Sequence, residues 1–512
     1  MKRAALLSVP LAAPLAGCGD DESSPEPEPE PTVFLHGVAS GDPLADAVIL
    51  WTRVTVADGA PTDVEWTIAS DAEFADVVAE GVFSTDADRD FTVKVDVTGL
   101  APATTHYYRF TALGETSPVG RTRTAPTGSV ARLRFGICSC ASYAHGFFNA
   151  YRLLARRYDL DVVLHLGDYI YEYGDGSYGD PQLGDARAYD PPHEIVTLED
   201  YRRRYAHYRS DADLQEVHRQ HPFITVWDDH ESANDSYTQG AENHDPSSEG
   251  EWSERKAQAQ RAYFEWMPIR EQADGRIWRS FRYGDLVDLI MLDTRLWGRE
   301  QQNTEMPDSD PTRQLLGDDQ EAWLDEQLTT STARWRLVGQ QVMMGQLQIF
   351  YNGDQWDGYP AARERFFDVL ESNTIDNTVV LTGDIHSSWA IDLTRDPMAQ
   401  TYDPATGAGS LGVELVTPGI TSPGFPAGLA AVADGIKEDN RHMKLVELVS
   451  RGYIVLDVDQ SRVEAAWYHM ADITTVNDDE RLGGVFTAND GENFLVEQAE
   501  PTPAPDAPAP AP

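Results

Sequence analysis

The sequence contains little cysteine and little positive charge for its length. Its 512 residues include three cysteines, and 40 lysines and arginines stand against 85 aspartates and glutamates, for a formal net charge of −45. Three cysteines do not make a disulfide framework, and Cys138 and Cys140 are too close in sequence to bond to each other without strain. The lack of a basic surface argues against nucleic-acid-specific binding, which displaces counterions through lysine and arginine.

Long apolar runs are also scarce, and the most prominent one opens the chain. Two basic residues precede the apolar stretch 4–16, and Leu15-Ala-Gly-Cys18 resembles the lipobox of a secretory signal. The resemblance implies that residues 1–18 are a lipoprotein signal peptide. The protein would then be exported and held at the periplasmic or extracellular face of the cell envelope, with its only membrane contact through a lipid anchor on Cys18.

Two further segments have the composition of unstructured chain. Residues 19–32 are acidic and rich in proline, and we expect them to form an extended linker. Residues 500–512 are mostly proline and alanine, and we expect a disordered tail there. The folded part therefore lies between these segments, and its length predicts two domains rather than one.

The first of these domains, residues 33–125, is expected to be all β. Short apolar stretches alternate with Gly, Pro and Asp turns, a spacing typical of a small β-sandwich. The run VTGLAPATTHYYRF at 97–110 resembles the corner of a fibronectin type III domain. The expected strands are 47–56, 64–69, 77–83, 91–97 and 106–112.

The second domain, residues 130–495, alternates strands and helices, which predicts a layered α/β fold. The expected strands are 132–137, 161–166, 223–227, 286–292, 335–342, 377–381, 413–416, 452–458 and 463–467. The expected helices are 146–158, 200–209, 253–266, 318–327 and 361–370.

Polar side chains follow several of these strands directly. Asp168 follows the second strand of the domain, Asp229 and His230 follow the third, and Asp384 and His386 follow the strand at 377–381. Ligands of α/β folds bind at the carboxyl edge of the sheet, so we expect these groups to gather there. Buried carboxylates cost several kcal/mol without a compensating charge, and these loops contain no lysine or arginine, so we expect metal cations to supply it.

The donor types indicate which ions would suit the site. A free thiol such as Cys140 is easier to understand in an exported protein if a metal ion holds it as thiolate. Thiolate, phenolate, imidazole and carboxylate together suit iron(III), whereas carboxylate and amide oxygens suit calcium, magnesium or manganese. Two ions about 3.5–4 Å apart, sharing a carboxylate, can polarise a phosphoryl group.

Four motifs give the chain a family resemblance. The motifs GDYIYE at 167–172, DDHE at 228–231 with Asn234, and GDIH at 383–386 resemble the PhoD-like family of alkaline phosphatases and phosphodiesterases. GVASGDPLADAVILWTR at 37–53 resembles the N-terminal domain of that family. The resemblance implies a four-layer αββα metallophosphoesterase sandwich with an N-terminal fibronectin III-like sandwich, and a site that holds iron(III) and calcium.

The resemblance also implies a role for individual residues. His230 matches the histidine that protonates or orients the phosphate ester. The implied iron ligands are Cys140, Asp168, Tyr171 and His386, with Asp168 as the bridging carboxylate, and the implied ligands of the second metal are Asp229, Asn234 and Asp384. Taken singly, these residues would more simply be a helix cap, a core aromatic, a buried thiol or a turn histidine. Glu172 and Glu231 fit a supporting role beside the ions, a role as a calcium ligand, or solvated loops.

We therefore expect hydrolysis of phosphate monoesters and diesters by a metal-bound hydroxide, with no phosphorylated enzyme intermediate. A phospholipase D or a teichoic acid phosphodiesterase could use the same ions. A surface-tethered binding protein, with the sandwich as its working part, is the alternative that is not an enzyme. The sequence does not indicate the natural substrate or the oligomeric state.

Overall fold

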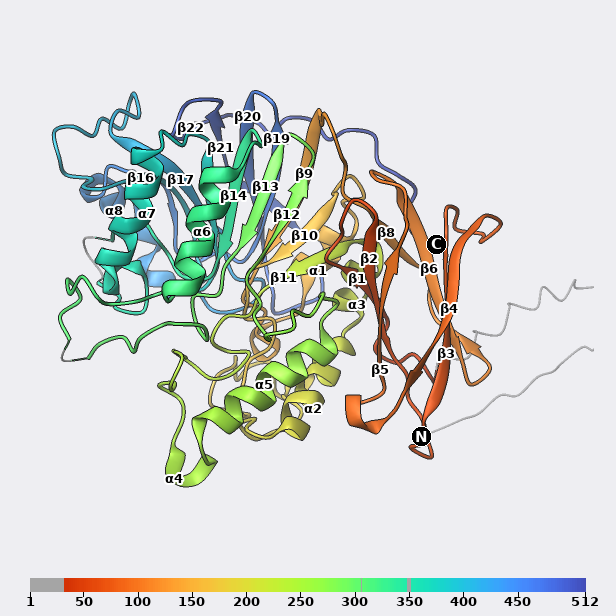
Figure 1. Cartoon of the computed structure of the whole chain (residues 1–512). Coiled ribbons are helices and arrows are strands. Elements are labelled where there is room, and N and C mark those ends of the chain that lie inside the picture. The colour runs from red at the N-terminus through yellow and green to blue at the C-terminus, as the bar shows by residue number, and fades with distance from the viewer. Residues whose placement is uncertain (1–31, 305, 348–350) are drawn as a thin grey trace, which may run out of the picture.

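The computed structural model describes residues 32–304, 306–347 and 351–512. The signal peptide, Cys18 and nearly all of the linker expected from the sequence lie outside these residues. Within them the chain forms three β-sheets with helices around them, and the predicted mixed α/β class is confirmed (Figure 1). No helix of the described residues is long and apolar enough to cross a bilayer.

The largest sheet has ten strands in the described part of the chain. Its centre is parallel, since β10 pairs in parallel with both β9 and β11, and β11 pairs in parallel with β1. In order across the sheet the strands are β22 (Val496–Glu497), β21 (Glu480–Asn489), β20 (Arg462–Met470), β19 (Gly452–Asp459), β9 (Arg132–Cys138), β10 (Val162–His165), β11 (Pro222–Thr225), β1 (Val38–Gly41), β2 (Ala47–Arg53) and β5 (Thr92–Thr98).

The second sheet has seven strands among the described residues. Strands β13, β14, β15 and β17 pair in parallel, so their carboxyl ends share one edge. In order the strands are β12 (Arg279–Tyr283), β13 (Val287–Met291), β14 (Trp335–Gln340), β15 (Thr378–Thr382), β17 (Ser410–Val416), β16 (Ser388–Thr394) and β18 (Met443–Glu447).

Side-chain alternation along the second sheet builds two cores. Leu289 and Leu337 join the large core shared with the ten-stranded sheet, whereas Ile290 and Val338 face a second core under α6 and α7. Successive side chains of a strand point to opposite faces, so each strand serves both cores. The rings of Phe135 in β9 and Tyr283 in β12 meet across the shared core at 5.6 Å.

Helices cover the outer faces of both sheets (Figure 1). Helices α6 and α7 pack on the seven-stranded sheet through leucines and phenylalanines, and α1 and α3 pack on the ten-stranded sheet through Leu154 and Val217. The helices are α1 (Asn149–Ala155), α2 (Leu198–Arg209), α3 (Ala212–Gln220), α4 (Pro246–Glu249), α5 (Trp252–Trp266), α6 (Asp318–Thr330), α7 (Pro360–Ser372) and α8 (Ala433–Asp439).

The N-terminal region is joined to the rest of the chain by sheet continuity. Strands β1, β2 and β5 share a core with a third sheet, as in a sandwich, but they are also the last three strands of the ten-stranded sheet. The two domains predicted from the sequence therefore share one sheet. The third sheet contains β4 (Val77–Thr85), β3 (Thr62–Ala69), β6 (Thr105–Ala112), β7 (Glu115–Thr116) and β8 (Gly120–Arg123).

The C-terminal segment differs from the disordered tail expected at 500–512. Its backbone is held by polar side chains of both regions. Gln220 exchanges two hydrogen bonds with the backbone of Ala511, and the Tyr107 hydroxyl donates to the carbonyl of Ala509. Composition alone predicted disorder, but the prolines leave their carbonyl groups free to accept, and the neighbouring side chains supply donors.

Candidate metal centre

The candidate site lies where the carboxyl ends of parallel strands from the two sheets meet. Cys140, Asp168 and Asp229 follow β9, β10 and β11 of the ten-stranded sheet, and Asp384 and His386 follow β15 of the seven-stranded sheet. The structure therefore brings together groups that lie far apart in the sequence, as the motif positions predicted.

Four of the expected ligands sit on backbone in the left-handed region. The φ angles of Cys140, Asp168, Asp384 and His386 are 59°, 56°, 63° and 54°. Residues other than glycine rarely adopt this conformation, and it concentrates at functional sites where the surroundings enforce it. Two hydrogen bonds between the loops help to do so: Cys140 N donates to Gly167 O at 3.0 Å, and Ala141 N donates to Asp168 O at 2.9 Å.

The hydroxyl of Tyr171 is the centre of one half of the site. It lies 2.8 Å from Asp168 Oδ2, 3.1 Å from His386 Nε2 and 2.6 Å from Ser422 Oγ. The ligand atoms of Cys140, Asp168 and His386 all lie within 4.8 Å of one another. The four groups that the family resemblance assigns to iron thus form one cluster, in which Cys140, Asp168 and Tyr171 are buried and His386 is partly exposed.

The histidine of this half is oriented for coordination. His386 Nδ1 lies 3.0 Å from the carbonyl oxygen of Pro423, which only accepts, so Nδ1 carries the proton. This leaves the lone pair of Nε2 directed to the side where Tyr171 and Asp168 lie. A backbone carbonyl that fixes the tautomer in this way is the usual support of a metal-binding histidine.

The thiol and the phenol of this cluster are hard to ionise in the buried site, so a bound cation is what would stabilise their charged forms. Burial, with the nearby charge of Asp168, raises the pKa of the Cys140 thiol and of the Tyr171 phenol well above their usual ranges. Asp168 Oδ1 is buried and has no hydrogen-bond partner. A thiol, a phenol and an unpaired carboxylate oxygen at one point are together the donor set of a strongly acidic metal ion.

Asp168 belongs to a second group as well. In this second group, a carboxylate oxygen of Asp168 and ligand atoms of Asp229 and His230 all lie within 4.8 Å of one another. A third group, within the same distance limit, consists of Asp228, Asp229 and Asp384. The position of Asp168 in two groups suits a bridging carboxylate. Asp228 was not among the ligands expected from the sequence.

Asn234 lies in the same loop as Asp229, but its side chain is engaged elsewhere. Its amide nitrogen donates to Glu242 Oε2 at 2.6 Å, and its backbone N donates to Glu172 Oε1 at 2.8 Å. These bonds use only its nitrogen donors, so its amide oxygen is the part that could serve as a ligand.

Two glutamates, Glu172 and Glu231, are buried and hydrogen-bonded within the site, which argues against the solvated loops that the sequence also allowed. Glu172 Oε2 accepts from His230 Nδ1 at 2.6 Å, and Glu231 accepts from the backbone N–H groups of Asp168, Tyr169 and Asp228. Both glutamates are buried rather than solvated. Glu231 thus joins the ends of β10 and β11.

The charge of Glu172 also acts on His230. Burial alone would lower the pKa of His230, but the charges of Glu172, Asp229 and Asp168 together outweigh it and raise the pKa well above its usual value, with Glu172 as the largest of the three. His230 is further enclosed by Tyr171, whose ring stacks on the imidazole with centroids 4.2 Å apart. A protonated imidazole held beside Asp168 is suited to donate a proton to a leaving oxygen.

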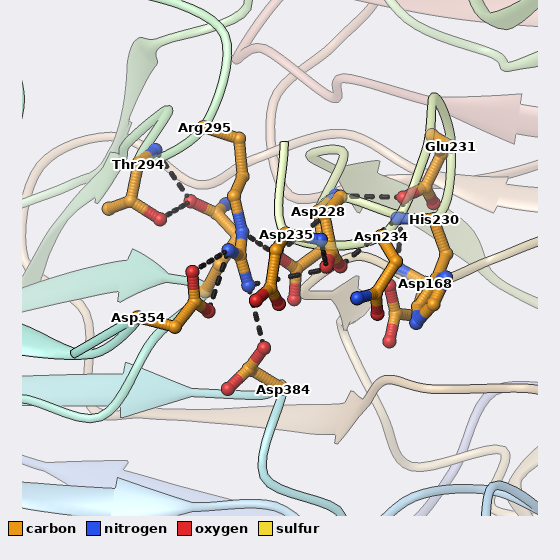
Figure 2. A network of polar contacts seen from close by, with 12 residues as sticks. Asp168, Asp228, His230, Glu231, Asn234, Asp235, Thr294, Arg295, Asp354 and Asp384 are labelled. Atoms are coloured by element: carbon orange, nitrogen blue, oxygen red, sulfur yellow. Dashed lines mark hydrogen bonds and ion pairs between the residues drawn. The ribbon is translucent and has the colours of Figure 1, made fainter. Parts of the chain in front are cut away.

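The other half of the site contains a cation that sequence reasoning missed. Arg295, fully buried after β13, contacts Asp228, Asp354 and Asp384, as Figure 2 shows. From the sequence we expected metal cations to supply the compensating charge, and in this half Arg295 supplies part of it. The sequence did contain a signal for Arg295: it follows the strand expected at 286–292, just as the motif residues follow the strands before them.

The fold and the site together define an α/β enzyme whose active groups suit metal ions. Comparisons with known proteins agree. A family model described as PhoD-like phosphatase matches residues 135–467, and one described as PhoD-like phosphatase, N-terminal domain, matches residues 20–126. The chain belongs to the PhoD-like phosphatase family.

Two relatives extend this result. Alkaline phosphatase D of Bacillus subtilis (strain 168) is 38% identical over 467 residues, which cover 86% of this chain and 78% of that protein. A solved structure titled "Structure of PhoD" superposes with a TM-score of 0.85 and 35% identity, covering 93% of this chain and 94% of that one. The chain is thus a hydrolase, and family membership implies phosphate esters as substrates. This disfavours the surface-tethered binding protein.

Proposed function

We propose that the chain is a metal-dependent alkaline phosphatase that hydrolyses phosphate monoesters and also diesters, with iron(III) and calcium as its ions. The observation that supports this most directly is the Tyr171 cluster. There a thiol, a phenol and an imidazole converge on a carboxylate that also belongs to a neighbouring acidic group. The first group suits iron(III), and the oxygen-rich one suits calcium.

Different residues of the chain would bind each ion and transfer the proton. Cys140, Asp168, Tyr171 and His386 would hold the iron, and Asp168 with Asp229, Asn234 and Asp384 would hold the calcium. When bound, such ions lower the pKa of a water molecule and offset the charge of the phosphoryl oxygens. His230, kept protonated by Glu172, gives its proton to the leaving oxygen of the ester.

Metal analysis of protein purified without chelator tests the assignment of the ions. We expect iron and calcium in the purified protein and a visible absorption band from thiolate and phenolate bound to iron(III). The variant Tyr171→Phe should lose the phenolate part of that band, and Tyr173→Phe, a neighbouring tyrosine, should keep it. Colourless, iron-free protein with full activity would overturn the iron assignment.

Substrate comparison tests the reaction. We expect turnover of 4-nitrophenyl phosphate and slower turnover of bis(4-nitrophenyl) phosphate. Hydrolysis of the diester alone would favour the phospholipase D or teichoic acid phosphodiesterase that the sequence also allowed. Absence of both activities in iron- and calcium-loaded protein would contradict the proposed function.

We also propose export and lipid anchoring through Cys18, which lies outside the described residues. The support is the lipobox-like sequence and the acidic linker that follows it. Expression of the full chain in a bacterium should give a membrane-associated protein. Cys18→Ser should release it or block its maturation, and an unchanged membrane fraction would contradict the anchor.

For the fold, we infer that the two helix-covered sheets are the four-layer metallophosphoesterase sandwich and that the N-terminal strands form a fibronectin III-like sandwich. The support is the shared core between the two sheets and the separate core of the N-terminal region. An experimental structure of the full chain would test both assignments.

A further inference from the structure

Arg295 is the most heavily engaged charged residue near the candidate site. Its Nε lies 2.5 Å from Asp228 Oδ1, its Nη2 lies 2.7 Å from Asp384 Oδ1, and its Nη1 lies 2.8 and 2.7 Å from the two carboxylate oxygens of Asp354. Asp229 Oδ1 is 3.8 Å away. The guanidinium thus lies at the centre of four acids.

The chemistry of this arrangement favours arginine over any other side chain. A guanidinium keeps its charge when buried and spreads five donors over a planar fork, so it can hold several carboxylates at once. Here each of its three nitrogens serves a different acid. One of these acids, Asp384, is an expected calcium ligand, and Asp228 and Asp384 belong to the group of three carboxylates described above.

We propose that Arg295 is a positioning residue that acts as a permanent cation of the acidic half of the site. It fixes the side chains of Asp228 and Asp384 and supplies there the positive charge that a further metal ion would otherwise have to provide. The part of the inference that concerns Asp384 as a ligand rests on the proposed metal centre. The charge compensation itself follows from the contacts alone.

Loss of this cation has a definite consequence. Without it, Asp228 and Asp384 would lose the cation they contact and Asp354 would keep only Arg299, and leaving buried charge uncompensated in this way strongly destabilises a fold. Three carboxylates facing one space are also the ligands that calcium prefers. A chain without the guanidinium should therefore take up a calcium ion in its place and depend on that ion for stability.

The chain offers a matched control in Arg299. This arginine is also fully buried and lies in the same loop, and it donates to Asp354 Oδ1 at 2.5 Å and to Thr294 O at 2.9 Å. Its ion pair is with Asp354 and not with Asp228 or Asp384. Replacing Arg299 thus loosens the Asp354 loop but leaves the charge between the other two acids in place.

The experiment compares full-length Arg295→Gln, Arg295→Lys and Arg299→Gln with the parent, each purified with its metals. The readouts are the melting temperature as a function of calcium concentration and the number of calcium ions bound at equilibrium dialysis. We expect Arg295→Gln to bind about one more calcium ion than the parent and to gain far more stability from it. Arg295→Lys should behave in between, and Arg299→Gln should respond to calcium as the parent does.

Equal calcium responses of Arg295→Gln and Arg299→Gln would overturn the inference, because Arg295 would then act only through the Asp354 loop. If Arg295→Gln does not fold, the double variant Arg295→Gln/Asp228→Asn decides, because Asp228 is the buried acid that contacts the Arg295 Nε. Removal of one acid should restore folding if uncompensated charge was the cause, and continued failure to fold would contradict the inference.

These outcomes are separable from those of the proposed function. Iron content and phosphatase activity of the parent test the proposed function, whereas the difference between the two glutamine variants tests Arg295. A parent without iron or activity could still show the calcium difference.

Discussion

The two halves of the candidate site achieve charge balance in opposite ways. In the half around Tyr171, the phenol is hydrogen-bonded to Asp168, His386 and Ser422. The Cys140 thiol is bonded to Ser139, and His386 is bonded to a backbone carbonyl. In the other half, the carboxylates converge on Arg295. We therefore expect the first half to ionise fully only with a bound ion, whereas the second has a counter-charge in Arg295.

Burial is the largest cause of the pKa shifts in both halves. Burial raises the pKa of Cys140 and Tyr171 strongly, so these groups stay neutral without a cation. Burial also raises the pKa of Asp228 and of Asp384 well above the usual range, and the charge of Arg295 opposes this shift without overcoming it. At Asp229 burial acts in the same direction, but Arg295, His230 and backbone N–H groups together lower the pKa below its usual value. The comparison teaches that the two halves differ in the fixed cation that Arg295 brings to one of them.

The largest expected effect comes from Asp168, which belongs to both of the groups assigned to metal ions. Asp168→Asn should lower kcat/KM for 4-nitrophenyl phosphate by at least about a thousandfold, because the shared carboxylate is lost. Circular dichroism should show a folded protein. Asp161→Asn, at the opposite end of β10, is the control and should retain activity. A normal rate in Asp168→Asn would contradict the role of Asp168 as a carboxylate shared by both metal sites.

Tyr171→Phe tests the half that depends on its ion. The phenol oxygen is lost while the ring that stacks on His230 stays, so iron should bind more weakly and kcat should fall by about a hundredfold. Iron content after dialysis measures the effect, with Tyr178→Phe as the neighbouring control. Unchanged iron retention would show that the phenol is not a ligand.

Glu172→Gln tests the proton donor. Loss of the carboxylate removes the largest of the three charges that raise the His230 pKa, so the imidazole should lose its proton at lower pH. We expect the alkaline limb of the kcat/KM profile to move to lower pH and the maximum to fall by about tenfold. Glu194→Gln, which removes another acid bonded to Asn243, should leave the limb in place. The same alkaline limb in Glu172→Gln and the parent would rule out His230 as the acid.

The smallest expected effect belongs to Ser422, which donates to the Tyr171 hydroxyl. Ser422→Ala should reduce iron affinity only about fivefold, because one neutral hydrogen bond contributes about 1 kcal/mol. Competition with a chelator measures it, and Ser387→Ala, a buried serine after His386, is the control. A loss as large as that of Tyr171→Phe would mean that Ser422 itself contacts the ion.

Much of the fold followed from local patterns. The strands expected at 132–137, 335–342 and 452–458 appear as β9, β14 and β19, because an apolar run bounded by turn residues needs no distant information. Strand β1, with the sequence Val-Ala-Ser-Gly, was missed. It is short, and its pairing with β11 joins residues that are about 180 positions apart, which no local pattern records.

The site was predictable to the extent that its residues follow strands. Cys140, Asp168, Tyr171 and His386 were expected together and lie together. Arg295 was missed because the charge argument compared only residues within the same loops. The guanidinium follows a different strand, in the second sheet. It reaches the carboxylates through tertiary packing of the two sheets, which a local sequence pattern does not record.

The parallel pairing of β1 with β11 has a consequence for how such chains evolve. Strand β11 ends directly before the segment 226–230, and Arg279 anchors the adjoining Asp42 through an ion pair of 2.7 Å. We therefore expect that recombination could not replace the N-terminal region with an unrelated domain. A crossover at its border would expose an unpaired strand beside the reactive groups, so both regions must be inherited together.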